Sequence, residues 1–158
     1  MFGLTQLGIV HTLIALIAVG TGAFLLIRQG RISPAGLAGK IYVFATIVAC
    51  ITALAIYQHG GFGKGHVLAI LTLVVLGVAT AAGRGMFGGV SKAVETVSYS
   101  ATFLFHWIPG VSEATTRLPL CSPLMNGPED PALKTILGVL FVLFVVGSVL
   151  QVRSLRKS

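Results

Sequence analysis

Histidines are the residues of this 158-residue chain whose chemistry can be inferred most directly from the sequence. Neutral imidazole is the commonest protein ligand for transition metals and a frequent axial ligand of haem iron. The four histidines are His11, His59, His66 and His106. A Gly-rich segment separates His59 from His66, and glycine lets backbone approach a bulky ligand closely. We therefore expect haem or a transition metal to be bound by His11, His66 and His106.

Further metal ligands are available in the sequence, but no established metal-binding spacing contains them. His59, Glu113 and Cys121 are the additional metal candidates, and Met125 is a fourth. The sequence contains no Cys-x-x-Cys, no His-Glu-x-x-His, no Walker-type phosphate loop and no Gly-x-Ser-x-Gly elbow. Its one aspartate, Asp130, excludes a protease built on paired aspartates. We therefore expect a binding protein and not an enzyme.

A second group of polar residues is spaced for one face of a helix. It consists of Glu95, Tyr99, Thr102 and His106, at intervals of four, three and four. Polar side chains that face hydrocarbon lack partners, so this polar stripe should face the bundle interior or a partner. Two interpretations stay open. Either the stripe is a proton or ion path, or Glu95 pairs with Lys92 or Arg84 at the inner interface while the hydroxyls bond backbone carbonyls.

The composition of the chain indicates which kind of structural element holds these residues. Apolar residues make up 55% of the chain and charged residues only 9%, whereas soluble domains carry about 25% charged residues. So few charges cannot cover a water-soluble globule, which excludes a soluble enzyme. The net charge of +7 comes from Lys and Arg between apolar runs, the pattern of cytoplasmic loops and not of a nucleic-acid-binding surface. We expect an all-α integral membrane bundle, one domain over residues 1–158.

Five segments are predicted to span the bilayer, which needs about 20 helical residues. They cover residues 4–27, 41–57, 66–83, 94–108 and 135–152. The fourth is short and polar, but the basic loops after the first and third segments and the basic tail all select the cytoplasmic side. The loop after the third segment and the C-terminal tail can both be cytoplasmic only if residues 94–108 cross the membrane. The N-terminus is then outside, the C-terminus inside, residues 109–134 form a Pro-rich outer loop, and all four histidines lie towards the outer face.

The expected partners are lipid and other membrane helices, with no nucleic acid. Small residues at intervals of four permit close helix packing, which predicts that Gly77, Ala81 and Gly85 form the packing face of the third segment. The last segment is apolar on all sides, as fits a surface that faces lipid or a partner. An accessory or scaffold subunit of a larger membrane complex, or a self-associating one, is therefore the alternative to a cofactor-binding protein.

Short motifs are spread over most of the chain. They are His11, Gly39–Tyr42, Gly61–Phe62, His66–Ile70, Phe105–Val111 and Thr116–Pro119. Together they resemble a family of bacterial inner-membrane proteins that carries no established activity. The resemblance implies a multi-pass protein of a bacterial-type inner membrane and gives weight to the histidine-bearing helices.

Overall fold

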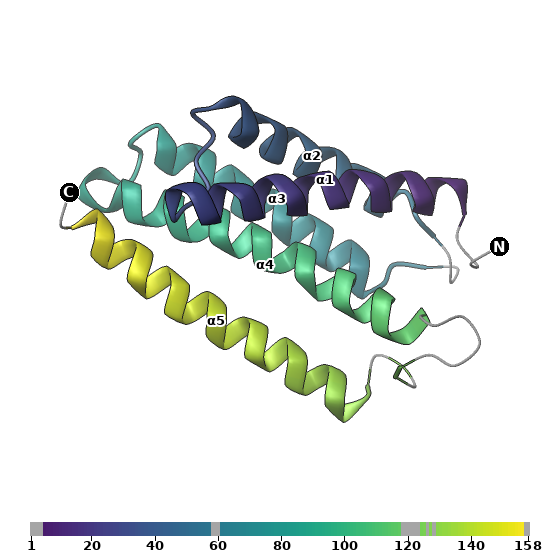
Figure 1. The fold of residues 1–158 in the computed structure, drawn as a ribbon. Coiled ribbons are helices and arrows are strands. Elements are labelled where there is room, and N and C mark those ends of the chain that lie inside the picture. The colour runs from purple at the N-terminus through teal and green to yellow at the C-terminus, as the bar shows by residue number, and fades with distance from the viewer. Residues whose placement is uncertain (1–4, 58–60, 118–123, 126, 128, 157–158) are drawn as a thin grey trace.

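The computed structural model describes residues 5–57, 61–117, 124–125, 127 and 129–156. Within them the elements are α1 (Gln6–Gln29), α2 (Leu37–Leu54), α3 (Lys64–Gly83), the short 3-10 helix η1 (Gly88–Val90), α4 (Ser91–Arg117) and α5 (Pro131–Leu155). Figure 1 shows the long helices side by side, with successive helices running in opposite directions. The expected all-α bundle is therefore confirmed.

Four of these helices, α1, α2, α3 and α5, are long and apolar enough to cross a membrane, as in a multi-pass membrane protein. Their bounds differ from the predicted segments by no more than four residues at either end. Helix α4 is not among the four, because its sequence carries too many polar residues. It nevertheless extends alongside the other helices for most of the length of the bundle (Figure 1).

Helix α4 is longer than the predicted fourth segment at both ends, and the expected loop is correspondingly shorter. The helix continues through Pro109 to Arg117, so residues 109–117 are helical. Proline removes one backbone donor but its φ is compatible with a helix, and the following turn is supported by an ion pair between Glu113 and Arg117. Helix α5 begins at Pro131, where the Asp130 side chain accepts a hydrogen bond from the Ala132 amide at 2.9 Å. Residues 109–117 and 131–134, which were expected in the loop, are therefore helical.

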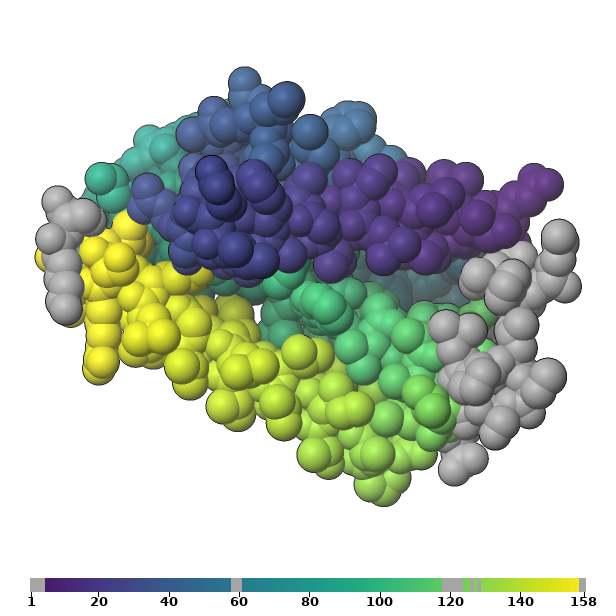
Figure 2. Space-filling view, in the orientation of Figure 1, coloured from purple at the N-terminus to yellow at the C-terminus, as the bar shows by residue number. Residues whose placement is uncertain are grey.

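The bundle buries a small hydrophobic core, centred on Tyr42, Leu25 and Leu76, together with several polar side chains. Its buried polar residues are Thr46, His66, Thr72, Ser91, Thr96, Ser100, Thr102 and Ser148. Many large apolar side chains are exposed, especially on α1 and α5, the two helices that form much of the face seen in Figure 2. Lipid is the solvent in which such a surface is stable, because an exposed apolar surface of this extent is unfavourable in water.

Small residues set how closely the helices approach. A Cβ added at Gly22 of α1 would lie 2.6 Å from the Phe103 ring and 2.9 Å from the Tyr42 ring, so only glycine fits between α2 and α4. The prediction that Gly77 lies on the packing face of α3 is wrong, because Gly77 is exposed and a Cβ there would contact nothing within 4 Å. The buried face of α3 consists of His66, Ala69, Thr72, Leu76, Ala79 and Ala82.

Charge is distributed unevenly between the two ends of the bundle. One end, near the C label of Figure 1, holds Arg28, Arg31, Lys40, Arg84, Lys92, Arg153 and Arg156, with Glu95 as its acidic residue among those described. The opposite end holds Lys64, Arg117 and Lys134 together with Glu113, Glu129 and Asp130. The described net positive charge is therefore concentrated at one end, which is the asymmetry expected of a cytoplasmic side.

Candidate functional site: the buried polar network

The polar stripe of α4 faces the interior of the bundle. Tyr99 is 2% exposed and Thr102 is fully buried, while Glu95 and His106 at the two ends of the stripe are partly buried. The stripe is therefore an internal polar face, adjacent to the hydrophobic core, in a bundle whose exterior carries large apolar side chains.

Tyr42 of α2 is the centre of the network. Its hydroxyl lies 2.8 Å from the Thr102 hydroxyl and 3.5 Å from the Tyr99 carbonyl oxygen, and Thr46 lies one turn further along α2. The Thr46 hydroxyl in turn lies 3.1 Å from Nε2 of His106. The His106 ring packs edge-on against the Tyr42 ring, with centroids 6.3 Å apart. Hydrogen-bonding groups of α2 and α4 thus alternate over more than one helical turn.

Towards the basic end, the network continues through Tyr99 to Glu95. The Tyr99 side chain lies near Thr80 of α3 and near the Glu95 carboxylate. Glu95 lies against Gly83 of α3, where an added Cβ would be 2.9 Å from its Oε1. Among the described residues it forms no ion pair, so the expected pairing of Glu95 with Lys92 or Arg84 is not found.

Towards the opposite end, His11 of α1 is hydrogen-bonded to α2, which defines its tautomer. Its Nδ1 lies 3.0 Å from the carbonyl oxygen of Ala49 and 3.0 Å from the Thr52 hydroxyl. A carbonyl oxygen only accepts hydrogen bonds, so the neutral His11 ring carries its proton on Nδ1. Its Nε2 therefore has a free lone pair, and His106 and Glu113 are close enough for electrostatic interaction with this ring.

His66 has a different role, at the beginning of α3. Its Nδ1 accepts a hydrogen bond of 3.1 Å from the Gly63 amide, closing the first turn of the helix. The ring stacks on Phe62 and tilts against Tyr57, with centroids 5.2 Å and 4.8 Å away. The side chain is 6% exposed and its Nε2 has no partner. Because Nδ1 acts as the acceptor, the proton of the neutral ring is on Nε2, which leaves that nitrogen without a lone pair for a metal.

The remaining metal candidates do not gather around these histidines. Within the described residues, no three His, Cys, Asp or Glu side chains are grouped as a metal site would require. Glu113 pairs with Arg117, and the Met125 amide bonds to the Thr115 carbonyl. The candidates His59 and Cys121 lie outside the described residues.

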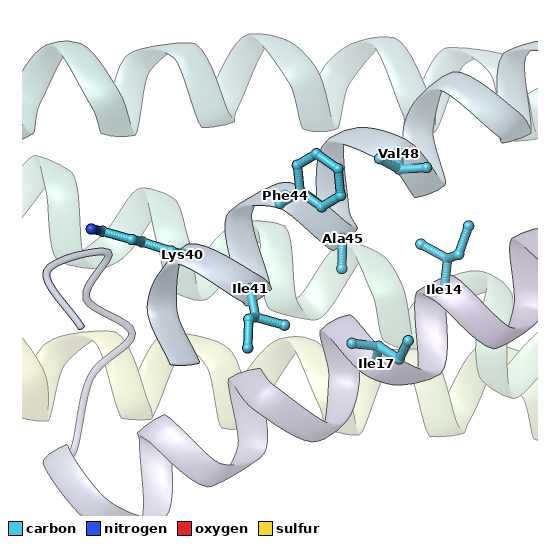
Figure 3. A pocket seen from close by; sticks show the side chains of 7 residues that line it. All are labelled: Ile14, Ile17, Lys40, Ile41, Phe44, Ala45 and Val48. Atoms are coloured by element: carbon cyan, nitrogen blue, oxygen red, sulfur yellow. The ribbon is translucent and has the colours of Figure 1, made fainter. Parts of the chain in front are cut away.

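A separate groove of about 440 Å³ between α1 and α2 lacks this chemistry. Figure 3 shows its lining residues, which are Ile14, Ile17, Lys40, Ile41, Phe44, Ala45 and Val48. No histidine, carboxylate or hydroxyl is among them, so this groove is a contact surface for apolar groups with one ammonium at its end.

Tyr42, Thr46 and Thr80 are functional candidates that the sequence reasoning missed. Tyr42 and Thr46 are four residues apart on one helix, and this spacing was the available signal. Comparisons of the chain with protein-family models, curated proteins and solved structures find no match.

Proposed function

We propose that the protein is a five-span bundle of a bacterial-type inner membrane that relays protons along the polar face of α4. The observation that supports this is the succession of polar groups through the interior of the bundle. Carboxylate, phenol, hydroxyl and imidazole groups follow one another from Glu95, through Tyr42, to His11, while the bundle exterior is apolar. Ionisable residues in membrane segments are costly, and those that occur usually have a function.

Each group in the network has the chemistry that a relay needs. A hydroxyl donates one proton and accepts another, and imidazole exchanges protons near neutral pH. The contacts from Thr102 to Tyr42 and from Thr46 to His106 are direct. Three steps, from Glu95 to the Tyr42 cluster, from Tyr42 to Thr46 and from His106 to His11, need a bridging water in this proposal.

Hydrogen bonding between helices is the structural alternative to a relay. Such bonds contribute about 0.6 kcal/mol each in membrane proteins, so hydroxyls alone serve that purpose. A carboxylate that forms no ion pair among the described residues is not needed for packing, and neither is a second titratable ring beside His106. Variants at Glu95 and His11 therefore distinguish a proton relay from hydrogen bonding that only stabilises the bundle.

Proton flux into liposomes tests the proposal. The protein is reconstituted with an internal pH-sensitive dye, and a potassium gradient with valinomycin drives proton entry. We expect flux above that of empty liposomes, and we expect Glu95→Gln to abolish it. Glu129→Gln, which removes an exposed carboxylate at the opposite end, is the matched control and should leave the flux unchanged. Flux equal to that of empty liposomes, or an active Glu95→Gln variant, would refute the relay.

Haem or transition-metal binding through His11 and His106 is the second candidate, and the His11 tautomer favours it. Metal-ligating histidines commonly donate their other ring N–H to a backbone carbonyl, as His11 does to Ala49. The pair His11 and His106 is better supported as a ligand set than His11 and His66, because Nδ1 of His66 is the acceptor for the α3 N-terminus. An absorption spectrum of the purified protein and elemental analysis test this. Absence of both a Soret band and a stoichiometric metal would remove the candidate.

An accessory role in a larger membrane complex also remains a proposal. Helix α5 supports it, because only Leu133 and Ser148 of this helix are buried within the described chain. Native gels in mild detergent distinguish the cases. A single band at the mass of one chain would exclude a stable complex.

A further inference from the structure

A second groove, with a volume of about 740 Å³, lies at the basic end between the C-terminal parts of α1 and α5. Its lining combines apolar and polar residues from both helices. Leu26, Leu150 and Leu155 give it an apolar wall, and the glutamines and Arg31 give it a polar rim.

The polar rim is held in place by the bundle. Gln151 of α5 donates a hydrogen bond of 2.8 Å from Nε2 to the carbonyl of Gly30 and accepts one of 2.8 Å from the Ser100 hydroxyl of α4. Gly30 ends α1 with a φ of 68°, a conformation that favours glycine, and this turn brings Arg31 to the groove. The groove is therefore joined to three helices and is not a loose gap between two of them.

The charge around the groove selects an anionic occupant. It lies at the end of the bundle where the described net positive charge is concentrated, with Arg28, Arg153 and Arg156 near its lining residues in sequence. Arg31 is exposed and forms no ion pair within the part of the chain that the structure describes. An apolar wall that continues from this rim fits an acyl chain, because it faces lipid.

We propose that this groove binds one anionic phospholipid, with its phosphate on Arg31 and an acyl chain along the leucine wall. Basic pockets between transmembrane helices on the cytoplasmic side commonly bind anionic headgroups. A free phosphate would leave the wall uncovered, and a zwitterionic lipid would leave the positive charge uncompensated. This inference does not depend on the proton relay, because the groove shares none of the relay residues.

Native mass spectrometry of the full chain in detergent tests the proposal. The ligands are phosphatidylglycerol, phosphatidylcholine with the same acyl chains, and glycerol 3-phosphate. We expect one phosphatidylglycerol to bind about fivefold more tightly than phosphatidylcholine, the contribution of one basic residue near an anionic group. Arg31→Gln should remove this difference, whereas Arg84→Gln, which deletes an equal charge at the same end outside the groove, should retain it.

A second pair of variants tests the wall without changing charge. A Cβ at Gly147 or at Gly138 of α5 would meet nothing, so both positions accept a larger side chain, but only Gly147 lines the groove. We expect Gly147→Leu to weaken binding of both lipids and Gly138→Leu to leave it unchanged. Equal binding of the two lipids, equal losses in Arg31→Gln and Arg84→Gln, or glycerol 3-phosphate binding as tight as that of phosphatidylglycerol would each overturn the proposal.

Discussion

The hydroxyls of Tyr42 and Thr102 lie 2.8 Å apart and join α2 to α4 where both side chains are fully buried. Around this contact, α1 comes close through Gly22, and the polar residues of α2 and α4 meet. The Tyr42–Thr102 hydrogen bond therefore belongs both to the packing of α1, α2 and α4 and to the proposed relay. Variants at this point can separate stability from proton movement.

Tyr42→Phe removes this hydroxyl and keeps the ring. We expect a loss of about 1 kcal/mol in unfolding free energy, because interhelical hydrogen bonds in membranes contribute about 0.6 and at most about 1.7 kcal/mol. We also expect proton flux to fall sharply, since the hydroxyl that bonds Thr102 is lost with it. Tyr57→Phe, at an exposed tyrosine, is the matched control for unfolding in detergent. Unchanged flux in Tyr42→Phe would remove this residue from the relay.

Gly22→Val tests the close approach of α1. The new side chain would enter the space of the Phe103 and Tyr42 rings, and such overpacking typically costs about 1–3 kcal/mol. Gly20→Val is the control, because a Cβ at Gly20 meets nothing. Denaturation of both variants in the same detergent measures the difference. Equal stabilities would show that α1 does not need glycine at this position.

Much of the architecture could be predicted because apolar runs and basic loops report directly on membrane helices. The bounds of α1, α2, α3 and α5 agree with the predicted segments to within four residues. The length of α4 could not be predicted, because proline is typical of helix ends and loops, although within a helix such as α4 it removes only one backbone bond. The packing face of α3 was also wrong. Small residues allow close contact but do not require it, and Thr72 and Leu76 face the interior instead of Gly77.

Only the part of the candidate site that lies on α4 could be predicted from the sequence. Periodicity identifies residues on one face of a single helix, and it placed Glu95, Tyr99, Thr102 and His106 together. It does not say which residues of other helices meet that face. Tyr42 and Thr46 contact it only because of the way α2 packs on α4. The hydrogen bond that occupies Nδ1 of His66 likewise depends on the local geometry at the beginning of α3.

Glu129 should make stability depend on pH in the acid range. Lys134 and Lys64, 2.9 Å and 3.1 Å from its carboxylate, lower the pKa of Glu129 below its ordinary value of 4.5. A lowered pKa in the folded protein contributes stability above pH 4.5 that is lost as pH falls through the lowered value. We expect Glu129→Gln to remove this acid-dependent part of the melting temperature, by a small amount because the groups are exposed. High salt should have the same effect as the substitution, and a difference that persists in high salt would contradict this explanation.

His66 should act mainly on stability, in contrast to His11. His66→Ala removes the acceptor for the Gly63 amide and should cost about 1 kcal/mol, the usual effect of losing a helix cap. His66→Gln keeps a side chain that can reach back to this amide and should restore most of the loss. If the protein binds haem or a metal, His11→Ala should abolish binding, while His59→Ala should matter little. Loss of the bound cofactor in His66→Gln, with normal stability, would instead make His66 a ligand.

The orientation in the membrane follows from charge and can be measured without knowing the function. Lys and Arg between spans resist translocation, so the end that holds Arg28, Arg31 and Lys40 should be cytoplasmic. Position 36 begins α2 at this end, and position 62, where Phe62 is 64% exposed, precedes α3 at the other. In single-cysteine variants of intact cells, an impermeant thiol reagent should label native Cys121 and Phe62→Cys but not Gly36→Cys.

The same labelling decides whether α4 crosses. A cysteine at Arg153 of α5 should be protected from outside together with Gly36→Cys, because α4 has to cross for both to be on the cytoplasmic side. Labelling of position 153 alone would mean that only four helices cross, and Glu95 and His106 would no longer connect the two sides. Labelling of position 36 from outside would invert the bundle, and the anionic-lipid groove would then face the outer leaflet.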